Sequence, residues 1–167
     1  MKPLIEPFGD DVVNLRLLEE RDLDSILDWR NRDDARIWFK TSNRITRDSH
    51  RTWYARYLQK HDDLVFVVEA SGSVVGMCAI YDIDHAIGLA EIGRFLIAPE
   101  FGGRGYMKRA CAVLVSLAIR DLHLHDLFLE VMEDNRRAIA VYRACGFGEE
   151  ARYDGLIRMS VRDEKEP

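Results

Sequence analysis

The chain has 167 residues, a formal net charge of −5 and 47% hydrophobic residues. This length predicts one domain, and the hydrophobic content suffices for a packed core. The acidic balance excludes the basic footprint of a nucleic-acid-binding protein, and no apolar run approaches the roughly 20 residues that a membrane span needs.

Three cysteines, Cys78, Cys111 and Cys145, lie far apart in apolar stretches. They form no CxxC pair and no cluster with metal-ligand spacing, so we expect reduced thiols and no metal site. The first residues lack the apolar core of a signal peptide. Together these features predict a cytoplasmic protein without a membrane or nucleic-acid partner.

The N-terminal third predicts a flexible arm, one strand and a series of helices. The arm covers 1–12, the strand 14–18, a helix 19–31, a short helix or loop 33–45, and a further helix follows Thr46. Acidic residues at the start of the first helix suit its dipole, and threonine is a preferred N-cap residue.

The middle of the chain predicts a hairpin and one further strand. Residues 64–69 and 74–81 are rich in apolar residues and are separated by a turn at 71–73, which is typical of two antiparallel strands. After a loop, a strand that contains Glu91 ends before Pro99, because proline cannot donate to a strand ladder.

A glycine-rich turn follows this strand. Gly102, Gly103 and Gly105 surround Arg104, and a helical pattern then runs from 104 to 120. A strand, a glycine turn and a helix in this order leave backbone N–H groups free at a helix N-terminus, where an anion is favoured. We interpret this turn as a pyrophosphate-binding loop.

Two other phosphate-binding loops do not fit this turn. A P-loop needs Lys-Ser/Thr after its last glycine, where this chain has Tyr106 and Met107. A dinucleotide fingerprint needs a third glycine where Lys108 stands. The remaining alternative is a plain helix-entry turn whose basic residues, Arg104, Lys108 and Arg109, are solvated.

The C-terminal part predicts a strand, a helix and a closing strand pair. The strand covers 128–131, the helix 135–144, the strand pair 147–152 and 156–161, and a charged tail 163–167. The whole order predicts an α+β fold, with a mixed, mostly antiparallel sheet of about seven strands and helices on both faces. The domain is expected to span 13–162.

Two motifs carry a resemblance to a known family. Residues 99–107 resemble the acetyl-CoA loop of the GNAT superfamily, Arg/Gln-x-x-Gly-x-Gly/Ala, although Gly102 replaces its first residue and Met107 its last. A second signature, Asn-x-x-Ala-x-x-x-Tyr-x-x-x-Gly-Phe, is matched completely. Its matching residues are Asn135, Ala138, Tyr142, Gly146 and Phe147.

The resemblance implies acetyl transfer from acetyl-CoA to a primary amine by direct attack, with no covalent enzyme intermediate. Glu91 is then the candidate base, with His50 and His85 as rivals, and Tyr142 is the candidate acid that protonates the leaving thiolate. The remaining cofactor-binding candidates are Phe95, Leu96, Ile97, Gly103, Arg104, Gly105, Tyr106, Met107 and Asn135.

The acceptor is less well specified. The chain resembles most the branch of ribosomal-protein N-terminal acetyltransferases and acetyltransferases of nucleotide-linked amino sugars, and we expect an amino sugar. The substrate-binding candidates are Trp29, Arg30, Asn31, His50 and Trp53. The alternatives are a protein N-terminus, a small-molecule amine, or a binding module without chemistry. Many members of the superfamily dimerise, so a homodimer is also expected.

Overall fold

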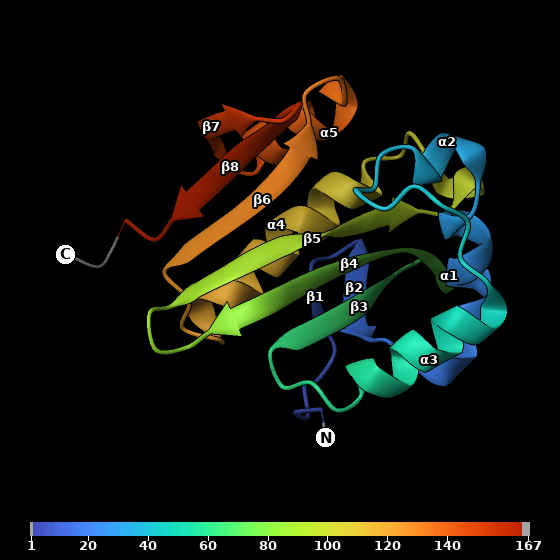
Figure 1. The fold of residues 1–167 in the computed structure, drawn as a ribbon. Helices are drawn as coiled ribbons and strands as arrows, with labels where there is room; N and C mark the ends of the chain where they lie inside the picture. The colour runs from blue at the N-terminus through green and yellow to red at the C-terminus, as the bar shows by residue number, and fades with distance from the viewer. Residues whose placement is uncertain (1, 165–167) are drawn as a thin grey trace.

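A twisted eight-stranded sheet runs through the molecule, with helices on both faces (Figure 1). In this computed structural model, residues 2–164 are described. The strands along the chain are β1 Phe8–Gly9, β2 Val13–Leu17, β3 Asp63–Ala70, β4 Ser73–Asp84, β5 Leu89–Ile97, β6 Asp126–Met132, β7 Gly148–Tyr153 and β8 Leu156–Arg162. Their spatial order is β1-β2-β3-β4-β5-β6-β8-β7.

The mixed, mostly antiparallel sheet that the sequence predicts is confirmed, because β5 and β6 are the single parallel pair among the described strands. One strand more is present than expected. Phe8–Gly9, in the segment predicted as a flexible arm, pair with β2 through Leu15 and Asn14. The predicted tail lies mostly outside the described residues.

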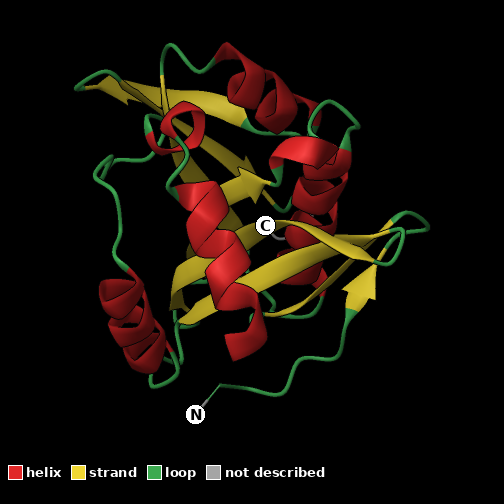
Figure 2. Cartoon of the chain, turned by 90° about the vertical axis from the view of Figure 1, so that its right-hand side faces the viewer, coloured by secondary structure: helices red, strands yellow, loops and turns green. Residues whose placement is uncertain are grey.

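The helices divide between the two faces of the sheet (Figure 2). They are α1 Leu23–Arg30, α2 Asp33–Arg36, α3 Arg47–Tyr57, α4 Tyr106–Arg120 and α5 Arg136–Ala144. Short 3₁₀ helices cover Glu20–Asp22 and Pro99–Phe101. Helices α4 and α5 pack on one face of the sheet, and α1 and α3 pack on the other.

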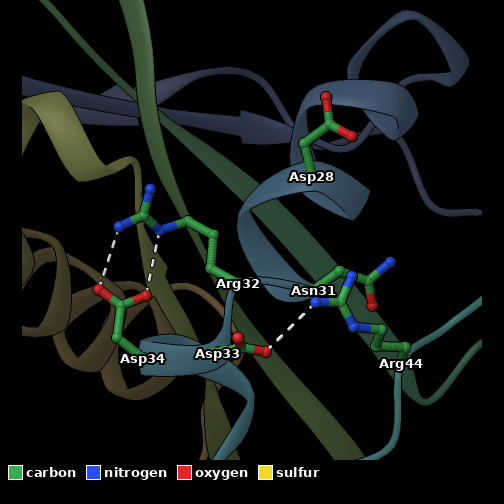
Figure 3. Close-up of a pocket in the computed structure, with 6 residues that line it drawn as sticks. All are labelled: Asp28, Asn31, Arg32, Asp33, Asp34 and Arg44. Carbon is green, nitrogen blue, oxygen red and sulfur yellow. Dashed lines mark hydrogen bonds and ion pairs between the residues drawn. The ribbon is translucent and has the colours of Figure 1, made fainter.

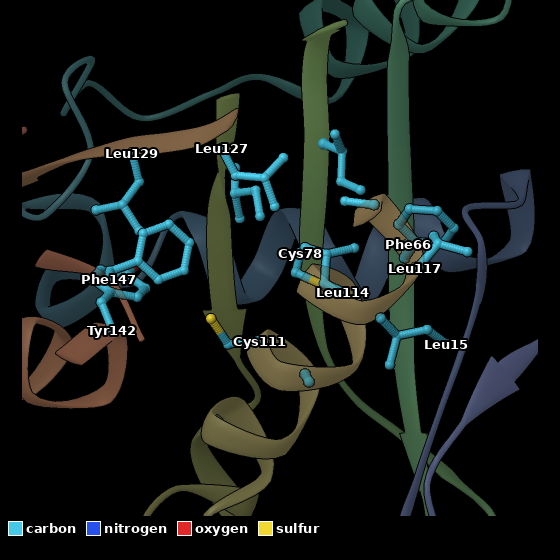
Figure 4. Packing of buried hydrophobic residues seen from close by; sticks show 14 of the residues in the cluster. Leu15, Phe66, Cys78, Cys111, Leu114, Leu117, Leu127, Leu129, Tyr142 and Phe147 are labelled. Carbon is cyan, nitrogen blue, oxygen red and sulfur yellow. The ribbon is translucent and has the colours of Figure 1, made fainter. Parts of the chain in front are cut away.

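Each face of the sheet has its own apolar core, covered by its own helices. The core under α4 and α5 contains Phe66, Leu114 and Leu127, all fully buried (Figure 4). The core under α1 and α3 contains Leu23 and Tyr57. Burial of this kind contributes roughly 25 cal/mol for each Å² of apolar surface. The three cysteines are free thiols, as the sequence predicts.

A β-bulge in β5 decides which side chains face which core. Across the β4–β5 ladder, Ala79 pairs with Gly93, but Met77 pairs with Leu96, so β5 has one extra residue there. Arg94 adopts a left-handed φ of 54° within it. Because an extra residue reverses the alternation of side chains, Leu96 packs on the α1–α3 side of the sheet.

Beyond the bulge, β5 and β6 separate. Their parallel ladder joins Leu89–Glu91 to Asp126–Phe128 and ends there. Figure 1 shows the two strands diverging toward their C-terminal ends, with α4 behind the gap. From Ile92 onward the edge of β5 toward β6 therefore has no strand partner, and its backbone groups can bind a ligand.

Candidate active site

The glycine turn brings free amide groups to the start of α4. Gly103 and Gly105 have left-handed φ values of 75° and 76°, which glycine adopts without steric cost. Gly105 is the N-cap and offers no side-chain cap. Within residues 2–164, no backbone carbonyl accepts a hydrogen bond from the amides of Gly103 through Lys108. These amides lie at the positive end of a 15-residue helix, where an anion is favoured, and the pyrophosphate-binding role of the turn stays a prediction.

The basic side chains around this turn differ from those that the sequence singled out. Arg109 is bound to Asp10 and Asp11 at 3.1 and 3.3 Å, so it fastens α4 to the N-terminal segment. Arg137 of α5 replaces it near the turn. A Cβ placed on Gly103 would lie 3.9 Å from its Nη2 atom. The sequence gives no signal for this role, because Arg137 occupies a variable position of the second motif.

The side chain of Tyr142, a residue of α5, packs toward β5 in the core beneath the separating strands. Its ring packs against Phe95 at 5.4 Å and Phe147 at 6.2 Å between centroids. Phe95 faces Tyr142 because the bulge turns it to this side of the sheet. Burial raises the pKa of the Tyr142 phenol well above its usual value, so the hydroxyl keeps its proton at neutral pH.

Asn135 caps the helix that carries Tyr142. Its Oδ1 atom accepts a hydrogen bond from the amide of Ala138 at 3.3 Å, which satisfies one of the free donors at the start of α5. The side-chain oxygen therefore has a structural partner in this conformation. The carboxamide NH₂ group is the part of Asn135 that can donate to a ligand.

Glu91 lies on the opposite face of β5 from Tyr142's core. It is half-buried, and Tyr81 Oη on β4 donates to its Oε1 atom at 3.1 Å. Burial raises the pKa of Glu91, and this effect outweighs the hydrogen bond from Tyr81 and the charge of Lys40. A carboxylate with a raised pKa is a better proton acceptor than an exposed one.

A second carboxylate, Glu130 of β6, lies on the same sheet face as Glu91. It is paired with Lys40, whose Nζ atom lies 2.9 Å from Oε1. The Glu130 side chain is only 15% exposed and that of Lys40 57%. Burial opposes ionisation of Glu130, but the hydrogen bonds from Lys40 and Tyr153 and nearby cations hold its pKa below the usual value. Lys40 and Glu130 are 90 residues apart, so no sequence pattern could have paired them.

Two predicted substrate-binding residues, Arg30 and Asn31, hold the segment that follows α2. The Arg30 guanidinium lies 3.9 Å from the Phe39 ring and donates to the carbonyl of Thr41. The Asn31 carboxamide bonds both backbone groups of Ile45 at 2.7 Å. In the structure these side chains stabilise the loop after α2, and their role in substrate binding stays a prediction.

The aromatic candidates of this region lie in the layer formed by α1 and α3. His50 stacks on Trp53 at 5.5 Å, and Trp53 stacks on Tyr57 at 5.3 Å. Trp29 packs against the same core. Burial lowers the pKa of His50, which favours its neutral form. His85, the other rival base, lies exposed in the turn after β4, whereas Glu91 lies in the sheet beside the separating strands.

An open hollow of about 630 Å³ lies on the surface of α1, α2 and the following loop (Figure 3). Four of its five charged side chains form ion pairs within the hollow. Arg32 binds Asp34 at 3.0 Å and Arg44 binds Asp33 at 3.3 Å. None of the residues that line it comes from β5, β6, α4 or α5. The separating strands and the glycine turn therefore form the candidate active site.

No group of three or more His, Cys, Asp or Glu side chains in 2–164 has the arrangement that could hold a metal ion. Over the same residues, no helix has the length and apolar character to cross a membrane.

Comparison with known proteins gives a consistent result. Residues 13–148 match the family model described as Acetyltransferase (GNAT) domain. The spermidine N(1)-acetyltransferase of Escherichia coli K12 is 31% identical over 161 residues, which cover 89% of this chain and 85% of that protein. YdaF of Bacillus subtilis, provisionally named a ribosomal N-acetyltransferase, is 30% identical over 152 residues, which cover 86% of this chain and 82% of that protein.

Solved structures of acetyltransferases have the same fold as this chain. The spermidine N-acetyltransferase of Vibrio cholerae, in complex with CoA and spermine, superposes with a TM-score of 0.85 at 26% identity and covers 93% of this chain and 98% of that one. Another structure of that enzyme, with a TM-score of 0.77 at 25% identity over 92% of this chain and 95% of that one, is described as dodecameric. None of these relatives is named as an amino-sugar acetyltransferase, so the predicted amino-sugar acceptor is not supported.

Proposed function

The chain belongs to the GNAT acetyltransferase family and uses acetyl-CoA as its acetyl donor, and we propose that its acceptor is a small alkyl polyamine of the spermidine class. The observation that carries this proposal is the pairing of Glu130 with an alkylammonium group, that of Lys40, beside the candidate base Glu91. The spermidine acetyltransferases of Escherichia coli and Vibrio cholerae, to which the chain is similar, support the same acceptor.

The charge of this face favours a cationic acceptor. Glu91 and Glu130 lie on the same side of adjacent strands, and Asp82 of β4 acts on Glu91 as a third negative group. Arg158, the cation of β8 near Glu130, is itself paired with Glu150 at 2.9 Å. A nucleotide-linked sugar would bring its diphosphate charges toward these carboxylates, whereas a polyamine would bring ammonium groups.

We propose that backbone groups bind the acetyl donor, acetyl-CoA. The amides of Gly103 through Lys108 bind the diphosphate of the coenzyme, with Arg104 and Arg137 as neighbouring cations. Tyr106 and Met107 contribute through their amides. The unpaired edge of β5 at Phe95, Leu96 and Ile97 binds the pantetheine arm as an added strand would.

The chemistry then follows from the groups beside the strand gap. An alkylammonium has a pKa of about 10.4, so Glu91 must remove a proton before the nitrogen can attack the thioester carbonyl. Amides of β5 near the bulge stabilise the negative oxygen of the tetrahedral intermediate. The nitrogen of the tetrahedral intermediate then loses a second proton to solvent. As the carbon–sulfur bond breaks, Tyr142 gives its proton to the departing thiolate, and the phenolate is reprotonated from solvent.

A panel of amines tests the acceptor. The wild-type protein is incubated with acetyl-CoA and spermidine, butylamine, a peptide with a free N-terminus, or a nucleotide-linked amino sugar, and released CoA thiol is measured. We expect spermidine to exceed butylamine in kcat/KM about tenfold, because one additional charged contact contributes about 1.5 kcal/mol. A faster reaction with the peptide would favour the function suggested by YdaF, and no thiol release with any amine would indicate a binding module.

A substitution of Glu130 tests whether this residue causes the preference for spermidine over butylamine. Glu130→Gln should raise the KM for spermidine about tenfold and leave that for butylamine nearly unchanged, because butylamine has no second ammonium group to lose its partner. Glu149→Gln is the matched control, since Glu149 is also paired with a basic side chain, that of Arg152, but lies on the outer strand β7. Equal effects of both variants on spermidine would contradict the assignment.

We also propose self-association, which the sequence resemblance predicts and which the dodecameric description of a relative supports. Sedimentation of the purified protein tests it, and a mass near the 19.3 kDa of one chain would contradict it.

A further inference from the structure

We propose that Tyr81 is a positioning residue that holds Glu91 in the orientation needed to take the proton of the acceptor amine, and that Gly93 keeps open the space that the Tyr81 hydroxyl occupies. The inference rests on the proposed function, because it takes Glu91 as the base. It adds Tyr81 and Gly93 to the residues considered for the site.

The two side chains meet across the β4–β5 ladder. Tyr81 and Glu91 are directly opposite each other in the register, and Tyr81 Oη lies 3.1 Å from Glu91 Oε1. Directly opposed residues of an antiparallel pair point to the same sheet face and interact through their side chains. The hydrogen bond leaves the other carboxylate oxygen of Glu91 to face a substrate.

The Tyr81 ring is itself held in place. The guanidinium of Arg94 lies 4.2 Å from its centroid. Arg94 Nη1 in turn lies 2.8 Å from Asp63 Oδ1, and the Asp63 side chain is only 3% exposed. Asp63 is the residue of β3 that pairs with Tyr81. A partly buried ion pair thus holds the ring through a cation–π contact, so the hydroxyl has little freedom to leave Glu91.

Position 93 needs a glycine because a side chain there would collide with Tyr81, and not because of its backbone conformation. A Cβ placed on Gly93 would lie 2.5 Å from Tyr81 Oη and 3.3 Å from the Tyr81 ring, and its φ is not in the left-handed region. Real Cβ atoms do not approach so closely, so any side chain at this position must displace the hydroxyl. The glycine and the tyrosine therefore form one unit with Glu91.

The charged groups around Glu91 fix the direction of the expected pH effect. Tyr81 and Asp82 face it from β4, Lys40 from the loop before α3, and Glu130 from β6. Burial raises the Glu91 pKa most, and Asp82 and Glu130 raise it further, while Tyr81 and Lys40 lower it. Loss of the Tyr81 hydroxyl must therefore raise the pKa of Glu91, since a contact that stabilises the carboxylate disappears.

The first test is the pH profile of Tyr81→Phe. We measure kcat/KM for spermidine at saturating acetyl-CoA from pH 5 to 9, with Tyr54→Phe as the control, because Tyr54 is a phenol of α3 that packs on Tyr57. In Tyr81→Phe the acidic limb of the kcat/KM profile should move to higher pH by about one unit. At the lowest pH values kcat/KM should therefore fall about tenfold. Affinity for acetyl-CoA should be unchanged, and Tyr54→Phe should keep the wild-type limb.

The second test places a methyl group at position 93, where it meets the Tyr81 hydroxyl. Gly93→Ala alone should reproduce the shift of Tyr81→Phe, because the methyl displaces the hydroxyl. Added to Tyr81→Phe, it should change kcat/KM by less than about twofold, since the methyl then occupies the space that the hydroxyl leaves, and coupled residues give non-additive effects.

The outcomes separate this inference from the proposed function. If the wild-type protein transfers no acetyl group to any amine, the proposed function fails. If wild-type transfer occurs but Tyr81→Phe keeps the limb in its wild-type position, or the two substitutions act additively, the positioning role of Tyr81 is overturned while the function stands. A shifted limb with non-additive effects supports the inference.

Discussion

The two sides of the candidate active site are built in different ways. The donor side, formed by the edge of β5, the glycine turn and the start of α4, presents mainly backbone groups. The acceptor side, on the opposite face of β5 and β6, presents side chains: Tyr81, Glu91 and Glu130, with Lys40 reaching over from a loop. The coenzyme is a fixed ligand of the family, whereas acceptors differ between its members.

This difference has a physical reason. Backbone amides recognise a diphosphate whatever the side chains are, so the donor side depends on chain conformation, on glycines and on strand separation. Recognition of an amine depends on charges at chosen positions, which can change without disturbing the fold. Substitutions on the two sides should therefore affect different steps, and the following predictions test this division in order of expected effect.

The largest effect is expected for Tyr142→Phe. Removal of the acid should lower kcat by about 10²-fold or more, the range typical of general acid catalysis. The ring contacts with Phe95 and Phe147 persist, so acetyl-CoA affinity should not change. Steady-state rates and calorimetric titration with acetyl-CoA measure both quantities, and an unaltered kcat would remove Tyr142 from this role.

Gly105→Val should weaken acetyl-CoA binding about tenfold or more, because a β-branched residue resists the left-handed φ of 76° and turns the amides away. Gly72→Val is the matched control. Gly72, in the β3–β4 turn, has the same φ of 76° and likewise nothing within 4 Å of a placed Cβ. Both variants should lose stability alike, and only Gly105→Val should lose affinity. Equal affinities in calorimetry would sink the role of the glycine turn.

Glu91→Gln tests the role of Glu91 as the base, through the pH dependence of kcat/KM. For the wild type, kcat/KM should rise as Glu91 loses its proton, with a midpoint above 4.5 because burial raises the pKa. The variant cannot titrate, so this acidic limb should disappear and the rate at neutral pH should fall at least about tenfold. Acetyl-CoA affinity should stay at the wild-type value. A limb that persists in the variant would pass the base role to another group.

The smallest effect is expected for Lys40→Met, which removes the internal partner of Glu130. A polyamine then no longer competes with the lysine, so the KM for spermidine should fall about two- to threefold, a modest change because Lys40 is more than half exposed. Lys60→Met, at the exposed end of the segment after α3, is the control. A raised KM in Lys40→Met would mean that the lysine assists the acceptor.

The same division explains what the sequence could predict. Strong apolar periods and cap residues predicted most elements, and Thr46 caps α3 as expected. The second motif led directly to Asn135 and Tyr142. On the donor side, the turn Gly103 to Gly105 was visible because only glycine adopts its conformation freely.

The acceptor side could not be predicted in this way. The bulge at Arg94 was not predicted, because Phe95, Leu96 and Ile97 are all apolar and an uninterrupted apolar run hides the reversal of side-chain alternation. The substrate roles expected for Arg30 and Asn31 rested on resemblance and stay predictions, while the contacts of these side chains with the loop after α2 gave no sequence signal. Tyr81 and Glu130 became candidates only when the sheet register placed them beside Glu91.

A crystal structure with CoA and spermidine tests the central claim most directly. We predict that the diphosphate contacts the amides of Gly103 through Lys108, that the pantetheine follows β5 beyond Ile92, and that a terminal nitrogen of spermidine lies within hydrogen-bond distance of Glu91 or a bridging water. A diphosphate bound elsewhere, or a polyamine on the α4–α5 side of the sheet, would contradict it.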